Sequence, residues 1–336
     1  MIVVPETKQN SLKKYKFIDL FAGIGGFHYA LNSFGANCVF ASEWDKFAAE
    51  TYNLNFKMKP FGDITTINET DIPNHDILCG GFPCQAFSIS GKQKGFDDIR
   101  GTLFFDIARI VNHHKPKVLF LENVKNLAKH DEGKTLKTII KTLEELEYNV
   151  FTKVFNASNF GLPQNRERIY IVAFSNSINS KKFKFPNPTN ENVCLENVLE
   201  RNPTNAKVIQ RQDINIYKNY SPSNSLFGET EVLNKPIQIG KVNKGGQGER
   251  IYHPLGHCIT LSAYGGGVGS KTGLYLVGGK IRKLSPRECA RVQGFPDDFK
   301  INNIDSQAYK QFGNSVSINV LQNIVIEIQK ILNENE

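Results

Sequence analysis

The sequence has no uninterrupted apolar run of about 18 residues, the length that a membrane-spanning helix requires. Its first residues, Met1–Lys8, do not follow the charged-then-apolar order of a secretory signal peptide. None of its six cysteines stands in a Cys-x-x-Cys pair, so neither a zinc site nor a disulfide framework is predicted. We therefore expect a protein of the reducing cytoplasm that is neither secreted nor inserted in a membrane.

Composition gives only a mild indication of the partner. Hydrophobic residues make up 40% of the sequence, charged residues 22% and aromatic residues 11%, which is ordinary for a globular protein. A length of 336 residues suggests two domains. The 41 Lys and Arg residues exceed the 33 Asp and Glu residues and give a net charge of +8. This basic balance favours a polyanionic partner such as nucleic acid without requiring one.

Short apolar runs alternate with amphipathic stretches from Phe17 to about Phe174. The apolar runs predict buried strands at Lys16–Phe21, Cys38–Ser42, Ile77–Cys79, Val118–Glu122 and Ile169–Phe174. The amphipathic stretches predict helices at Phe27–Phe34, Lys46–Phe56, Thr102–His113 and Thr135–Glu147. This alternation predicts an α/β fold with a doubly wound, mostly parallel sheet, whose ligands bind at the carboxyl ends of the strands.

The pattern changes in the second half of the chain. Around Asn176–Lys235 the periodicity is lost, which predicts a connector and then the start of a second, β-rich domain. Two short β-like pieces follow between glycine-rich turns, at Ile259–Ser262 and Leu274–Val277. Helical periodicity returns at Pro286–Gln293 and at Ser317–Leu332.

The first motif is a glycine-rich turn, Asp19–Gly26, which follows the first predicted strand. Its spacing differs from the Gly-x-Gly-x-x-Gly pattern that places a pyrophosphate at a helix N-terminus. Glu43 and Trp44 follow the second strand, where they suit ribose hydroxyls and an adenine face, and Asp63-Ile64 follows at the third position. This arrangement favours an adenosine ligand without phosphates, such as S-adenosylmethionine. The alternative is that the glycines only make a tight turn.

The second motif is the loop Gly80–Ser88, which contains Cys84 after a proline. A cysteine on a polar loop at the carboxyl end of a strand is placed as a nucleophile would be. Free cysteines are more often buried, so packing in the core is the interpretation for Cys38, Cys79, Cys194, Cys258 and Cys289.

Two further motifs carry charge at strand ends. Glu122 ends a predicted strand, where a carboxylate is costly to bury unless it is paired or used, although a helix-capping role is the alternative. Gln164–Arg168 enters the strand that follows. Arg166 and Arg168 would point to one face of this strand and could bind an anionic or carbonyl-bearing ligand. A solvated charge cluster is the alternative.

These four blocks, with Arg287–Pro296 and Tyr309–Val316 after them, resemble the DNA (cytosine-5) methyltransferases of bacterial restriction–modification systems. The blocks stand in the order of the family. The resemblance runs from about residue 15 to 325, apart from a poorly matching stretch near 178–235, and it includes the segment Gly245–Tyr252.

The resemblance implies covalent catalysis on a cytosine flipped out of duplex DNA. Cys84 would add to C6, Glu122 would contact N3 and N4, Arg168 would bind O2 and Arg166 would support the site. The cofactor, S-adenosylmethionine, would be held by Phe21, Gly23, Gly25, Glu43, Trp44, Asp63, Ile64, Pro83, Leu103 and Asn314. The DNA would be contacted by Gln85, Ser88, Ile89, Ser90, Gln247, Arg250, Thr260, Tyr264 and Gly267.

The resemblance also implies an organisation and a biological role. A catalytic domain would comprise residues 1–198, completed by 314–336, with a target-recognition domain at 199–285 and a hinge at 286–313. The expected site is GCGC in double-stranded DNA, methylated at the inner cytosine. The enzyme would be a monomer in the bacterial cytoplasm, associated with the nucleoid, and its partner in function would be a cognate restriction endonuclease without direct contact.

Three other functions stay open from the sequence. A tRNA cytosine-5 methyltransferase shares the catalytic blocks, but the segment Lys244–Tyr252 argues against it. A catalytically inactive DNA-binding regulator would not need Cys84, Glu122 and Arg168 together. A nicotinamide dehydrogenase is disfavoured because the pyrophosphate-binding fingerprint is absent.

Overall fold

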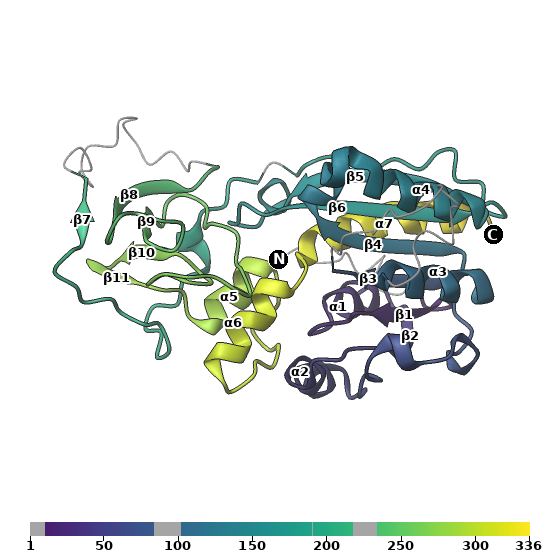
Figure 1. The fold of residues 1–336 in the computed structure, drawn as a ribbon, viewed down its shortest axis with the longest axis horizontal. Coiled ribbons are helices and arrows are strands. Elements are labelled where there is room, and N and C mark those ends of the chain that lie inside the picture. Colours follow the sequence, from purple (N-terminus) through teal and green to yellow (C-terminus); the bar gives the residue numbers. More distant parts are fainter. Residues whose placement is uncertain (1–10, 84–101, 190, 218–233) are drawn as a thin grey trace. The chain divides into compact units, whose positions relative to one another are not determined.

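The computed structural model describes residues 11–83, 102–189, 191–217 and 234–336 (Figure 1). The chain divides by its own contacts into two compact units. Among the described residues, the six-stranded unit comprises 11–83, 102–155, Glu167–Asn187 and Val320–Glu336. The five-stranded unit comprises Asn156–Arg166 and Pro188–Asn319.

The six-stranded unit holds a mostly parallel sheet with helices along both faces. Its strands are β1 (Lys16–Leu20), β2 (Asn37–Ala41), β3 (Ile77–Gly81), β4 (Val118–Val124), β5 (Tyr148–Asn156) and β6 (Glu167–Ser175). Its helices are α1 (Gly26–Asn32), α2 (Lys46–Phe56), α3 (Leu103–His114), α4 (Lys134–Glu145) and α7 (Ile318–Glu334). The strand order is β2-β1-β3-β4-β6-β5. Strands β1 to β4 pair in parallel and β6 is antiparallel to β4, so the predicted doubly wound, mostly parallel fold is confirmed.

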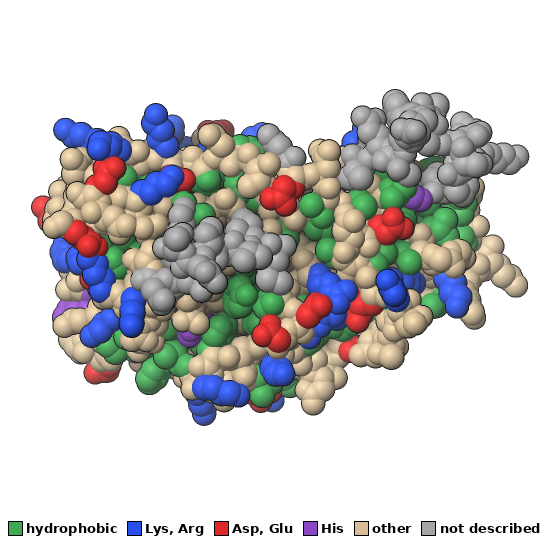
Figure 2. Space-filling view, turned by 180° about the vertical axis from the view of Figure 1, so that it is seen from behind, with side chains coloured by type: hydrophobic (Ala, Val, Ile, Leu, Met, Phe, Trp, Pro, Cys, Tyr) green, Lys and Arg blue, Asp and Glu red, His purple; other side chains and the backbone are tan. Residues whose placement is uncertain are grey.

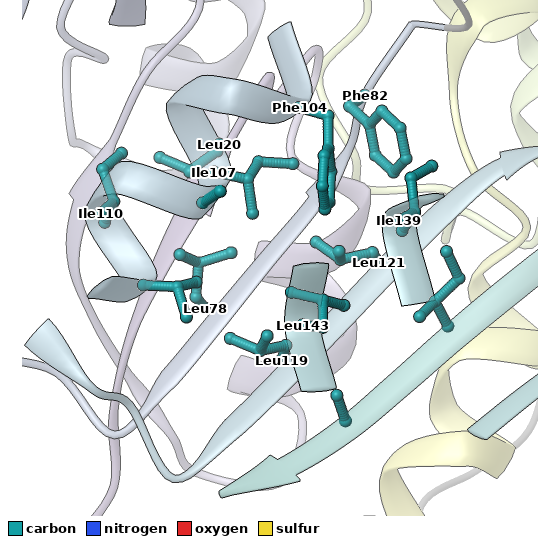
Figure 3. Packing of buried hydrophobic residues seen from close by; sticks show 14 of the residues in the cluster. Leu20, Leu78, Phe82, Phe104, Ile107, Ile110, Leu119, Leu121, Ile139 and Leu143 are labelled. Atoms are coloured by element: carbon teal, nitrogen blue, oxygen red, sulfur yellow. The ribbon is translucent and has the colours of Figure 1, made fainter. Parts of the chain in front are cut away.

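Alternate strand residues bury apolar side chains against α3 and α4 on one face of this sheet. Leu78 and Leu119 point from the strands toward Ile107 of α3 and Leu143 of α4, and all four are fully buried (Figure 3). Each such side chain contributes about 1.5–3 kcal/mol relative to exposure. This packing holds the strands in a fixed register, so that the residues beyond their carboxyl ends are positioned by the core.

Helices α1 and α7 belong to the opposite face of the sheet. Phe27 of α1 packs edge-on against Phe120 of β4, with ring centroids 5.0 Å apart. Gln322 of α7 donates a hydrogen bond to the hydroxyl of Ser33, which caps α1. The last helix of the chain therefore packs beside the first helix of the sheet.

The five-stranded unit is built around a smaller, mostly antiparallel sheet. Its strands are β7 (Asn215–Ile216), β8 (Ile237–Lys241), β9 (Arg250–His253), β10 (Leu274–Val277) and β11 (Lys280–Arg282), in the order β11-β10-β9-β8-β7. Only β9 and β10 pair in parallel among the described strands of this sheet. Ile239, Ile251 and Leu274 form the centre of its apolar core. Two helices, α5 (Pro286–Gln293) and α6 (Asp305–Asn314), belong to the same unit.

The structure corrects several sequence-based expectations. The predicted strand Leu274–Val277 is confirmed, but Ile259–Ser262 is not a strand: only an isolated bridge pairs Cys258 with Gln164. The strand β5 and the helix α6 were not predicted. The contacts within the chain assign the predicted hinge at 286–313 to the five-stranded unit. The predicted boundaries of the catalytic domain, the target-recognition domain and the hinge stay a prediction. In the described parts of the chain, no helix is both long and apolar enough to cross a membrane.

Candidate active site

The carboxyl edge of the six-stranded sheet joins the glycine-rich turn to Glu43. The backbone N–H of Gly23 donates to Oε2 of Glu43 over 2.8 Å, and the N–H of Asp45 donates to Oε1 over 2.8 Å. Burial raises the pKa of Glu43, and these backbone donors oppose the rise. A carboxylate offers about four acceptor positions, so the two oxygens retain capacity for a further hydroxyl donor.

The turn itself has an unusual backbone. Phe21, Gly23 and Gly25 all have positive φ angles, of 54°, 55° and 87°. A side chain at Gly25 would place its Cβ 2.1 Å from the ring of Phe56, so the turn accepts only glycine there. Phe21 is the non-glycine residue among them and pays about 1–2 kcal/mol for this conformation. Such strain is typical of segments that a binding site holds in place.

Trp44 and the Asp63-Ile64 segment flank Glu43. Trp44 is 81% exposed, so an aromatic face is available beside the carboxylate. The backbone N–H of Glu43 donates to the carbonyl of Phe61 over 2.8 Å, which brings the chain before Asp63 alongside. Asp63 caps the short helix Ile64–Thr66, and Ile64 is buried beneath it. These residues together fit an adenosine: a hydroxyl acceptor, a flat aromatic surface and an exposed acid.

The segments that contain Pro83 and Leu103 pack against each other. Phe82 and Phe104, their neighbours in sequence, pack with ring centroids 5.8 Å apart. The side chain of Asn123 donates to the carbonyl of Phe82 over 2.8 Å and so fixes the start of the loop. This role of Asn123 was not predicted from the sequence, although its position directly after Glu122 was an available signal. The predicted nucleophile Cys84 and the predicted DNA contacts Gln85, Ser88, Ile89 and Ser90 lie outside the described residues.

Glu122 and Arg168 form a buried ion pair at this edge. Glu122 pairs with Gly81 of β3 in register, and Val124 pairs with Arg168 of the antiparallel β6. The register therefore brings the start of β6 to the carboxyl end of β4. Nε of Arg168 lies 3.1 Å from Oε1 of Glu122, and the two side chains are only 16% and 10% exposed. Burying such a pair costs desolvation of both charges, which favours a functional reason for keeping it.

Arg166 does not share a face with Arg168. Strand β6 begins at Glu167, so the predicted alternation of the two arginines along one strand is wrong. The guanidinium of Arg166 is buried in the five-stranded unit, where it donates to the carbonyl oxygens of Leu261, Gly313 and Ser315 over 3.2, 3.3 and 2.6 Å. Its donors bind protein carbonyls in this structure, whereas Arg168 lies beside the acid.

The predicted DNA contacts of the five-stranded unit gather on two adjoining loops. Gln247 lies in the loop before β9 and Arg250 is the first residue of β9, whereas Tyr264 and Gly267 belong to the second loop, and all four are exposed. The loops are joined because the N–H of Gly269 donates to the carbonyl of Gly248 over 2.7 Å. A side chain on Gly248 would collide with the carbonyl of Gly266, which lies 2.0 Å from the position of its Cβ.

Two more predicted residues also lie in the five-stranded unit. The hydroxyl of Thr260 donates to the carbonyl of Asn165, and Asn314 is the exposed last residue of α6. Basic side chains do not locate the interface by themselves. On the face drawn in Figure 2, Lys and Arg side chains are interspersed with Asp and Glu.

The remaining cysteines behave as core residues. Cys38, Cys79, Cys194, Cys258 and Cys289 are buried, as predicted. Burial raises the pKa of the Cys38 thiol to about 12, and it also raises the pKa of Cys79, Cys258 and Cys289. Burial and a raised pKa both disfavour the thiolate form of these four cysteines, which is the form that acts as a nucleophile. Within the described residues, no group of three or more His, Cys, Asp or Glu side chains could hold a metal ion.

The chain is similar to known proteins over most of its length. The family of C-5 cytosine-specific DNA methylases matches residues 15–330. The Type II methyltransferase M.HhaI of Haemophilus parahaemolyticus is 56% identical over 329 residues, which are 98% of each chain. The Type II methyltransferase M.HpaII of Haemophilus parainfluenzae is 45% identical over 95% of this chain and 90% of that protein. The S. pombe Dnmt2 methyltransferase structure matches with a TM-score of 0.65 at 19% identity, over 95% of this chain and 99% of that chain, and supports the fold alone.

The α/β fold with its mostly parallel sheet is that of S-adenosylmethionine-dependent methyltransferases. The chain belongs to the C-5 cytosine-specific DNA methylase family. It is therefore an enzyme of DNA methylation, and S-adenosylmethionine is the methyl donor of its family.

Proposed function

We propose that this enzyme methylates C5 of the inner cytosine of GCGC in duplex DNA through a covalent adduct with Cys84. The observation that carries the proposal is the buried pair of Glu122 and Arg168 at the edge where the described chain reaches Pro83. An acid and an arginine held side by side match one edge of cytosine, on which N4, N3 and O2 follow one another.

The chemistry requires a nucleophile because C5 of cytosine is itself a poor one. Addition of a thiolate at C6 converts the ring to an enamine whose C5 can attack an electrophilic methyl group. The bound cofactor supplies that methyl group as a sulfonium. Loss of the C5 proton and elimination of the Cys84 thiolate then restore the aromatic ring.

Glu122 and Arg168 would make the ring electrophilic. Glu122 would accept from N4 and hold a proton or strong hydrogen bond at N3, and Arg168 would donate to O2. Their ion pair, 3.1 Å long, keeps both groups oriented before the base arrives. Arg166 would support the site through the carbonyl groups that it binds.

Each of the predicted cofactor residues would have a role of its own. Glu43 would accept from the ribose, Trp44 would stack on the adenine, and Asp63 would contact its polar edge. Phe21, Gly23, Gly25, Ile64, Pro83, Leu103 and Asn314 would complete the site.

The DNA must open for this chemistry, because C6 is not accessible within the stack, and flipping costs a few kcal/mol. In the segment 85–101, which lies outside the described residues, Ser90 would replace the lost partner, and Gln247 of the five-stranded unit would contact the orphaned guanine. Arg250 would bind a guanine in the major groove, Tyr264 and Gly267 would place backbone groups against the bases, and Thr260 would contact a phosphate. The likeness of Gly245–Tyr252 to the family supports GCGC.

The biological role follows from this activity. Methylation of GCGC would protect the host DNA from a cognate restriction endonuclease that cuts the same sequence. The enzyme would act as a monomer in the bacterial cytoplasm, associated with the nucleoid.

Fluorine at C5 tests the covalent step, because fluorine cannot leave as the proton does. A GCGC duplex with 5-fluorocytosine at the inner position, incubated with S-adenosylmethionine, is expected to give a complex that survives denaturing electrophoresis. Cys84→Ser protein and a duplex fluorinated at the outer cytosine are expected to give none. A persistent complex with either control would overturn the assignment of the nucleophile or of the target base.

A further inference from the structure

A fully buried glutamine of the motif Gln164–Arg168 binds the segment that precedes the exposed loop with Tyr264 and Gly267. Gln164 is 0% exposed, and its Oε1 accepts from the backbone N–H of Leu261 over 3.1 Å. Its Nε2 donates to the carbonyl of Val292 over 3.3 Å and to Oε1 of Gln293 over 3.2 Å. An N–H group only donates and a carbonyl only accepts, so these partners fix the orientation of the amide.

Leu261 is held at both of its backbone groups by side chains. Gln164 binds its N–H, and Arg166 donates to its carbonyl over 3.2 Å. Leu261 lies outside the strands of the five-stranded sheet, so these side chains replace the partners that a sheet ladder would give. Three residues later stands Tyr264, 75% exposed, followed by the glycine turn that contains Gly267.

The same backbone is supported from a second side. Gln293 is also fully buried, and its Nε2 donates to the carbonyl of Phe312 over 2.8 Å. The next residue, Gly313, packs directly on the peptide between Ser262 and Ala263, because a Cβ there would lie 2.3 Å from the nitrogen of Ala263. The contacts of Gln164 and Gln293 therefore converge on the stretch that leads into the exposed loop.

A buried amide is an expensive way to gain stability alone. Each polar group must be satisfied, and an apolar side chain of the same volume avoids that cost. What the amide adds is direction, because it accepts and donates at fixed positions. We infer that Gln164 is a positioning residue for DNA recognition: it holds Leu261 so that Tyr264 and Gly267 meet the base pairs in one register. This inference rests on the proposed function.

Gln164→Met tests the inference, because methionine keeps the length and volume of glutamine without its hydrogen bonds. The matched control is Gln322→Met: Gln322 is 2% exposed, lies in α7 of the six-stranded unit, and donates to Ser33. For each protein, kcat and KM would be measured on a GCGC duplex and on duplexes with one base pair changed, together with the Kd for S-adenosylmethionine.

Gln164→Met is expected to raise KM for the GCGC duplex and to reduce discrimination between duplexes by about tenfold, the factor for 1.4 kcal/mol. Its Kd for S-adenosylmethionine should equal that of the wild type. Gln322→Met is expected to keep the KM and the discrimination of the wild type. Equal discrimination in Gln164→Met and Gln322→Met would overturn the inference. If the wild type methylated no duplex at all, the proposed function would fail instead, and the inference with it.

Hydrogen exchange provides a second test that needs no variant to fold. In the wild-type protein, the N–H of Leu261 is expected to exchange as slowly as the N–H groups of β9 and β10, although it lies in no strand. Exchange at the rate of an exposed loop would refute the contact with Gln164 and with it the positioning role.

Discussion

Substitution of Arg168 by methionine leaves a carboxylate buried without its cation. Glu122 and Arg168 are 10% and 16% exposed at the side chain. Removing one partner of a buried pair costs about 3–5 kcal/mol. Because both groups are still partly exposed, the cost should lie near the lower end of this range. Arg168→Met is therefore expected to reduce the free energy of unfolding by about 3 kcal/mol. A second ion pair, whose acid Glu167 directly precedes Arg168 in β6, provides the contrast.

Lys125 and Glu167 are 2.7 Å apart, closer than the buried pair, but their side chains are 48% and 44% exposed. Exposed pairs contribute about 0–1 kcal/mol, so Lys125→Met should cost less than 1 kcal/mol. Burial rather than distance therefore decides the order of the two variants.

Urea unfolding followed by circular dichroism measures both variants, and a methyl-transfer assay runs beside it. The double variant Glu122→Gln with Arg168→Met should recover most of the stability lost in Arg168→Met, because no charge is then left buried. The double variant should recover no activity, because it has neither the carboxylate nor the guanidinium that would contact cytosine. Equal stability of Arg168→Met and Lys125→Met would refute the reasoning.

Three further predictions concern the cofactor and the DNA. Burial raises the pKa of Glu43, so its carboxylate should be protonated at a higher pH than that of an exposed glutamate, whose pKa is about 4.3. The Kd for S-adenosylmethionine should therefore rise as the pH falls through this range. Glu43→Gln should weaken binding at neutral pH and remove this pH dependence in calorimetry, and a dependence that persists would contradict the role. Trp44 is 81% exposed, so Trp44→Ala should leave the unfolding midpoint unchanged. It should raise the cofactor Kd roughly 5- to 150-fold, since stacking contributes about 1–3 kcal/mol, and an unaltered Kd would exclude stacking. Arg250→Ala should reduce the preference for GCGC over changed duplexes by about 1–3 kcal/mol, and unchanged discrimination would refute its contact with guanine.

Elements with strong local signals could be predicted from the sequence. The helix α5 matches its prediction because Ser285 and Glu288 form a capping box at its start and Gly294 ends it in a left-handed conformation. The strand β5 gave a weaker signal. It lies at the edge of the sheet, and most of its residues, apart from Tyr148 and Phe155, are not buried, so no apolar run marks it.

The candidate site divides in the same way. The ends of parallel strands meet at one edge, so the turn at Gly23 and the acid Glu43 could be placed together from the sequence. The hydrogen-bond partners of Arg166 could not be predicted, because Leu261 and Gly313 are about one hundred residues or more away along the chain. Contacts over such separations are set by the tertiary packing of the five-stranded unit and not by any local pattern.

Methyl transfer to defined duplexes tests the central claim most directly. Labelled S-adenosylmethionine would be incubated with duplexes that contain GCGC, GGCC or CG alone, with tRNA in parallel and Cys84→Ala protein as the control. Label is expected in the GCGC duplex alone, and none with Cys84→Ala. Label in another duplex would contradict the proposed recognition site, and label in tRNA without any in DNA would contradict the proposed substrate.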